Sequence, residues 1–273
     1  MKKYLRYFVL LVVSIVLVAC GKSGSKEEGT STKITVGASN VPHAAILEQA
    51  KPLLKEEGID LEIITYNDYV LPNAALEEGD IDANYFQHIP YFEKNVEEHH
   101  YDFVNLGSIH LEPMGAYSKK YKSLSELPDG ATILVSNSVT DHGRVLAILQ
   151  EAQLIKVKDG VELSTADFED IEDNPKNLVI DYEYDPALMT TLLEQDEGDV
   201  VFINSNFAVD HGISPLTDAI AIESSSSPYA NIIAARSEDK DSEALKKLVE
   251  VLHSDKIKDF ILKEWKGAVV PVD

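Results

Sequence analysis

Short apolar, β-branched runs alternate with longer amphipathic stretches along the chain. In the first half we expect strands at 34–38, 61–65, 81–85, 103–106 and 114–117, and helices at 43–57, 71–78 and 90–99. After residue 130 we expect strands at 132–135, 179–182, 200–203, 220–222 and 232–235, and helices at 144–152, 186–193, 205–211, 242–253 and 256–263. A strand-then-helix rhythm is typical of a mostly parallel sheet covered by helices. The pattern therefore predicts an α/β fold.

Two shifts in composition divide this pattern into lobes. The lysine-rich segment 119–123 and the serine-rich segment 223–227 are the places where the chain is expected to cross between lobes. The expected lobes are residues 33–118 plus 228–273 (lobe I) and residues 119–227 (lobe II). Two lobes joined by two crossings indicate a protein that closes on its ligand by a hinge motion.

The amino terminus indicates export and lipidation. Residues 1–19 begin with three cations and continue as an apolar run that is shorter than the roughly 20 residues needed to span a bilayer, so we interpret them as a signal peptide. The run ends in Leu-Val-Ala-Cys, and Cys20, the only cysteine, would carry the lipid. An ordinary secretory signal with an incidental cysteine is the alternative. Residues 20–32 are polar and predict a flexible tether. We expect attachment to the extracytoplasmic face of the cell membrane.

Charge and histidine spacing argue against several classes of function. The chain has 47 acidic and 24 basic residues, a net charge of −23, so it has no electrostatic means of binding nucleic acid. Metal capture is not expected, because the adjacent pair His99 and His100 should diverge near a helix end. No G-x-S-x-G motif is present, and paired carboxylates mean little in so acidic a chain. We therefore expect neither an enzyme nor a cofactor.

Aromatic side chains cluster after two successive expected strands. The segments YNDYVLPN (66–73) and NYFQHIPY (84–91) contribute Tyr66, Tyr69, Tyr85, Phe86, His88 and Tyr91. Loops at the carboxyl ends of the strands bind ligands in open α/β folds. Aromatic walls suit a small, partly apolar ligand, and a thioether packs well against ring edges. Packing in the hydrophobic core is the alternative for each ring.

Polar side chains follow other strands. Arg144 ends the segment SNSVTDHGR (136–144) at the expected start of a helix, where it could hold a carboxylate with two parallel bonds. The alternative for Arg144 is an ion pair between helices. Asn204 and Asn206 follow one strand and Asn231 precedes another, and an amide can both donate and accept. Asn206 could instead cap a helix.

Several of these segments look like those of the NlpA family of lipoproteins, to which the binding components of methionine importers belong. The likeness runs through YNDYVLPN, EEGDIDANYFQHIPY, EPMGAYSKK, KDGVEL, DNPKN and SPYANII, in order along the mature chain. The resemblance implies a two-lobed type II periplasmic-binding-protein fold. It also implies a receptor that delivers L-methionine to an ABC permease and its ATPase. We expect this receptor to be a monomer.

The resemblance also implies roles for individual residues. One group would enclose the methionine side chain, with the histidine near the sulfur: Tyr69, Phe86, His88 and Tyr91. A second group would hold the charged ends of the ligand: Arg144 the carboxylate, Asn206 and Asn231 both ends, and Glu112 the ammonium. Asn204 and Asp141 lie in the same segments and are further candidates.

This chain departs from the family pattern before Gly143. The family commonly has PNDPTN there, where this chain has SNSVTDH (136–142). Asp141 places a negative charge near the expected ligand carboxylate, which is unfavourable unless Asp141 binds the ammonium or a backbone amide. Phe207 stands where a tyrosine is usual. A related amino acid, a methionine-containing dipeptide or a metal ion are the alternative ligands.

Overall fold

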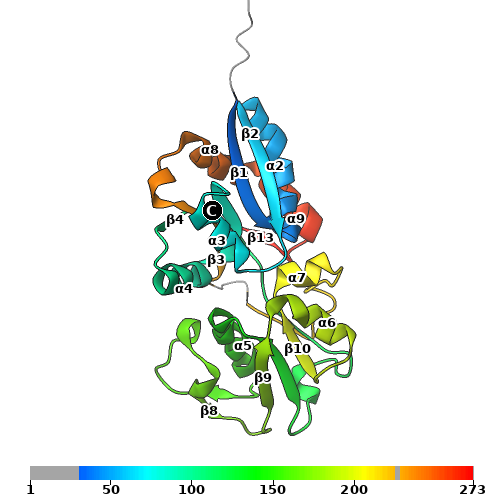
Figure 1. Ribbon diagram of the computed structural model, residues 1–273. Coiled ribbons are helices and arrows are strands. Elements are labelled where there is room, and N and C mark those ends of the chain that lie inside the picture. Colours follow the sequence, from blue (N-terminus) through cyan, green and yellow to red (C-terminus); the bar gives the residue numbers. More distant parts are fainter. Residues whose placement is uncertain (1–30, 225–227, 273) are drawn as a thin grey trace, which may run out of the picture. The chain divides into compact units, whose positions relative to one another are not determined.

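The computed structural model describes residues 31–224 and 228–272 (Figure 1). Its first sheet has the strand order β13-β4-β12-β3-β1-β2. The strands are β1 (Thr32–Ser39), β2 (Ile59–Tyr66), β3 (Ala83–His88), β4 (Phe103–Leu111), β12 (Ala230–Arg236) and β13 (Val270–Pro271). β1 pairs in parallel with β2 and β3, whereas β12 runs antiparallel to β3 and β4. The expected mostly parallel sheet is therefore mixed.

Five helices accompany the first sheet: α2 (Ala45–Glu56), α3 (Leu71–Glu78), α4 (Ile89–His99), α8 (Glu243–Leu252) and α9 (Asp255–Trp265). α2 buries Ile46, Leu47, Ala50 and Leu54, which recur at helical spacing and pack in one core with strand residues such as Val36. α2 lies against β2, α8 and α9 (Figure 1). α3 ends at Gly79, whose φ of 79° is in the left-handed region that glycine adopts without strain.

The second sheet has the strand order β11-β5-β10-β6-β9. Its strands are β5 (Gly115–Tyr117), β6 (Thr132–Ser136), β9 (Val179–Tyr184), β10 (Val200–Ile203) and β11 (Ala221–Ile222). The helices with it are α5 (Val139–Glu151), α6 (Met189–Glu194) and α7 (Ser205–Asp210), and β7 (Lys156–Val157) pairs with β8 (Ile171–Asp173). Single helical turns lie at Asn40–Ala44, Leu124–Glu126, Leu163–Thr165, Phe168–Asp170, Pro186–Leu188 and Ser237–Asp239. A separate core joins α5 to this sheet through residues such as Val145, Leu149 and Phe202.

The chain crosses between the two sheets twice, as the α/β type II binding-protein fold requires. The crossings lie between β4 and β5 and between β11 and β12. The prediction that residues 115–118 belong to lobe I was wrong, because Ala116 of β5 pairs with Phe202 and Ala221 in the second sheet. The lysines expected at the first crossing lie on the second sheet's loops, where Lys119 Nζ donates to the Glu194 carbonyl.

Two element boundaries differ from the expectation where the site residues lie. β3 continues to His88 instead of ending at Tyr85, because β12 pairs with it on the side opposite β1. α5 begins at Val139, so Asp141 lies in its first turn and not in a loop. Within the described residues, no helix is long and apolar enough to cross a membrane. The expected signal peptide, Cys20 and the tether up to residue 30 lie outside the described residues.

Candidate functional site

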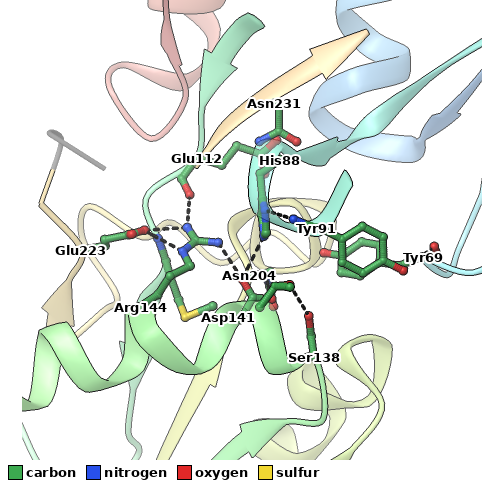
Figure 2. Close-up of polar contacts among 12 residues, drawn as sticks. Tyr69, His88, Tyr91, Glu112, Ser138, Asp141, Arg144, Asn204, Glu223 and Asn231 are labelled. Atoms are coloured by element: carbon green, nitrogen blue, oxygen red, sulfur yellow. Dashed lines mark hydrogen bonds and ion pairs between the residues drawn. The ribbon is translucent and has the colours of Figure 1, made fainter. Parts of the chain in front are cut away.

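One cavity lies between the two sheets, and Figure 2 shows several of the side chains that line it. All ten side chains expected in the ligand site line it: Tyr69, Phe86, His88, Tyr91, Glu112, Asp141, Arg144, Asn204, Asn206 and Asn231. Gln87 and Ser205 line it too, and sequence reasoning missed both. Gln87 lies inside the FQH motif, and Ser205 lies between the two expected asparagines.

Aromatic rings form one wall of the cavity. The ring of Tyr69 lies 6.0 Å from those of Phe86 and Tyr91, and 5.2 Å from that of Phe207. The other two candidates of the aromatic clusters are elsewhere: Tyr66 packs against the apolar cluster around Leu76, and Tyr85 is fully buried in the first sheet's core. These two rings therefore pack in apolar cores, which was the alternative to a place in the ligand site.

The phenol of Tyr69 joins the two sides of the cavity, and the phenol of Tyr91 holds the Tyr69 backbone. Tyr69 Oη donates to Asn206 Oδ1 at 2.6 Å, and Tyr91 Oη donates to the Tyr69 carbonyl at 2.8 Å. The Asn206 side chain therefore accepts from Tyr69, and Asn204, at the cap position of α7, makes no side-chain cap bond. Burial raises the pKa of Tyr91 to about 12 and the pKa of Tyr69 well above its usual value. Both phenols thus remain protonated donors near pH 7.

Asp141 is held by three side chains from different elements (Figure 2). The Tyr91 backbone N–H donates to His88 Nδ1 at 3.1 Å, so the His88 proton is on Nε2, which donates to Asp141 Oδ1 at 3.1 Å. Asn204 Nδ2 donates to Asp141 Oδ2 at 3.0 Å. Burial alone would raise the pKa of Asp141, but these bonds and the charge of Arg144 lower it below its usual range. Asp141 is therefore ionised inside the cavity.

Arg144 is already bonded to protein groups on most sides. Its Nε and Nη2 donate to Glu223 Oε2 at 3.0 and 2.5 Å, its Nη1 to Asp141 Oδ1 at 3.1 Å, and its Nη2 to the Glu112 carbonyl at 2.7 Å. These bonds use four of the five N–H groups of a guanidinium. The two-bond grip on a ligand carboxylate is therefore not available in this structure. Arg144 forms ion pairs with Asp141 of its own helix and with Glu223 after β11, and not the ion pair between helices that was the alternative. Glu223 begins the serine-rich segment 223–227 and was not among the residues expected in the site.

A second cluster lies behind the cavity, around the side chain of Glu112. In the first sheet, Asn231 on β12 pairs with His88 on β3 on one side and with His110 on β4 on the other. Glu112 Oε1 lies 2.6 Å from His110 Nε2 and 3.2 Å from His43 Nε2. Burial raises the pKa of the Glu112 carboxyl, although His43 and Arg144 act against this. Burial also lowers the pKa of His43 to about 4 and that of His110 to about 3, so both imidazoles are neutral at pH 7.

Comparison with known proteins shows which family the chain belongs to. The sequence model of the NlpA lipoproteins matches residues 34–273. The chain belongs to the NlpA lipoprotein family. One NlpA relative, the methionine-binding lipoprotein MetQ of Bacillus subtilis, is 49% identical over 274 residues, covering 100% of this chain and 99% of its own. The D-methionine-binding lipoprotein MetQ of Escherichia coli is 39% identical over 95% of this chain and 94% of its own.

A solved NlpA-like structure is described as holding methionine. It is a nutrient binding protein from Burkholderia cenocepacia bound to methionine, 42% identical, with a TM-score of 0.83 over 88% of this chain and 100% of its own. A pheromone cOB1 precursor and lipoprotein from Enterococcus faecalis is 62% identical, with a TM-score of 0.87 over the same share of this chain and 100% of its own. These matches confirm the family and the fold that the sequence resemblance implied.

Proposed function

We propose that this NlpA lipoprotein captures L-methionine between its two sheets and delivers it to an ABC importer. The observation that carries the proposal is the convergence of all ten expected side chains on one cavity. Rings from the first sheet and polar groups from the second meet there, so closing the two halves would surround a small zwitterion. Methionine-binding relatives and the methionine-bound Burkholderia structure support the same ligand. We assign the protein a binding role and no catalytic one.

The aromatic wall is the part of the cavity that suits the methionine side chain. Tyr69, Phe86 and Tyr91 form a group of rings within 6.0 Å of one another. Sulfur packs favourably at ring edges, which contributes about 0.3–1.5 kcal/mol per contact. His88 is fixed by Tyr91 and Asp141, so it would present an imidazole face and not a free nitrogen to the ligand.

The charged ends of the ligand need different partners from those expected. Because Glu223 and Asp141 occupy Arg144, we assign the ligand carboxylate to its remaining Nη1 hydrogen and to amide NH₂ groups. Asn206 and Asn231 can supply these groups, since their carbonyl oxygens already face Tyr69 and His43. We assign the ammonium to Asp141, whose carboxylate is ionised and lines the cavity.

Isothermal titration with the purified protein tests this function. We expect L-methionine to bind at one site per chain. Titrations with D-methionine, methionine-containing dipeptides and related amino acids would measure the specificity of this site. Asn206→Ala should weaken methionine binding by about tenfold, the loss of one buried hydrogen bond to a charged group. Asn67→Ala, at an exposed asparagine outside the cavity, is the matched control. Equal affinities of both variants for methionine would remove Asn206 from the site.

Delivery to a transporter and attachment to the membrane need tests in cells. Uptake of labelled methionine by a strain lacking the gene should be restored by the wild type, and the Asn206→Ala variant should restore less uptake when methionine is scarce. A strain that takes up methionine equally well without the protein would contradict the delivery role.

A further inference from the structure

We propose that His43, His110 and Glu112 form a binding site for a divalent transition metal ion such as Zn²⁺, beside the methionine cavity. The proposal does not rest on the methionine function. His43 lies in the turn before α2, His110 at the end of β4 and Glu112 just after that strand. One donor atom from each lies within 4.8 Å of the other two.

The donor set is one that zinc uses. Two imidazole nitrogens and one carboxylate oxygen leave a fourth position open in a tetrahedral site. Donor atoms in such a site are about 3.3 Å apart when each lies 2.0–2.1 Å from the metal. Glu112 Oε1 is 3.2 Å from His43 Nε2 and 2.6 Å from His110 Nε2. Small side-chain shifts would therefore bring the three atoms into coordination geometry.

The charge around Glu112 also favours a cation. The two other carboxylates near the cavity, Asp141 and Glu223, share the guanidinium of Arg144. The Glu112 carboxylate instead contacts the two imidazoles. Binding a metal through both Nε2 atoms would place the ring proton of each histidine on Nδ1, where Tyr85 Oη can accept the proton of His110 in a hydrogen bond. A divalent ion would place a positive charge in direct contact with this buried carboxyl.

Groups that can orient the ligands are in place. Tyr85 Oη is hydrogen-bonded to His110 Nδ1, the nitrogen that would face away from the metal. His43 Nδ1 has no hydrogen-bond partner among the described residues, so only its Nε2 side has polar partners. Asn231 Oδ1, 3.0 Å from His43 Nε2, lines the methionine cavity. The open fourth position would therefore face that cavity and take Asn231, water or a group of the bound ligand.

Titration of the full-length protein in detergent with Zn²⁺ alone, in competition with a chromophoric chelator, tests the site. We expect one high-affinity Zn²⁺ per chain and a loss of about 100-fold or more in affinity for His43→Gln and for His110→Gln. Tyr85→Phe should cost about tenfold, the effect of losing an orienting partner. His100→Gln, the same substitution at an exposed histidine, is the matched control and should bind Zn²⁺ as the wild type does.

Two outcomes would overturn the proposal. One is no bound Zn²⁺ at chelator-buffered concentrations, and the other is equal binding by His43→Gln, His110→Gln and the control, which places the ion on surface carboxylates. X-ray absorption at the zinc edge of the unmodified protein covers the case in which a variant does not fold. Two imidazole ligands are expected, and a shell of oxygens alone would refute the site. Failure of methionine binding with Zn²⁺ binding retained would count only against the proposed function.

Discussion

Replacing Arg144 tests whether the polar centre of the site is an ion-pair cluster. Arg144→Met keeps the length of the side chain but leaves the carboxylates of Asp141 and Glu223 without their shared guanidinium. These two residues are only 1% and 8% exposed. Removing one partner of a buried ion pair costs about 3–5 kcal/mol. Asp141 keeps its bonds from His88 and Asn204, and Glu223 keeps the Met114 N–H, so we expect about 4 kcal/mol. That is a large part of the roughly 5–15 kcal/mol by which domains are stable.

Urea unfolding measures this loss. The only tryptophan, Trp265, is buried in the first lobe's core and provides a fluorescence signal, with circular dichroism as a second probe. The cluster also predicts a coupling: in a double-mutant cycle, Arg144→Met and Glu223→Gln should together cost about 2 kcal/mol less than the sum of their separate effects. Lys156→Met is the control, because its partner Glu172 is half exposed and the pair should contribute little.

The pH dependence of the loss has a defined sign. The folded pKa of Asp141 is below its unfolded value of about 3.9, so its stabilisation is complete above that pH and is lost as pH falls through the folded pKa. Without Arg144 that stabilisation is smaller. The difference between Arg144→Met and wild type should therefore be constant near pH 7 and shrink below about pH 4. A variant within about 1 kcal/mol of wild type at pH 7, with no coupling to Glu223, would refute the cluster.

Three further changes have expected outcomes. Gly143→Ala should lower the melting temperature clearly, at a cost of about 1–3 kcal/mol, because a Cβ there would lie 1.8 Å from the Leu163 carbonyl oxygen; an unchanged thermal transition would contradict this packing. Tyr69→Phe removes the donor to Asn206, so methionine affinity measured by titration should fall by about fivefold, and an equal or tighter affinity would show that this bond does not position Asn206. Metabolic labelling with a fatty acid should mark the wild type and miss Cys20→Ala, and equal labelling would exclude Cys20 as the lipidated residue.

Local pattern was sufficient for most of the elements and for the membership of the cavity. The strand-helix rhythm predicted β1, α3 and β10 closely, because periodicity and end signals such as Gly79 act within a few residues. The rings and amides were recognised because they lie near the ends of strands, where an α/β sheet presents its ligand groups. These inferences needed only short stretches of chain.

The partners of those side chains were decided by tertiary structure. Glu223 reaches Arg144 across 79 positions of the chain, and His43 meets Glu112 across 69. Strand order decides a further set of neighbours: β12 lies between β3 and β4, which places Asn231 beside both His88 and His110. Hydrophobic patterning indicates which face of a strand is buried, but not which strand is its neighbour. For that reason the residue types alone suggested that Arg144 binds a ligand carboxylate. Only the folded structure brings the carboxylates of Asp141 and Glu223 to its guanidinium.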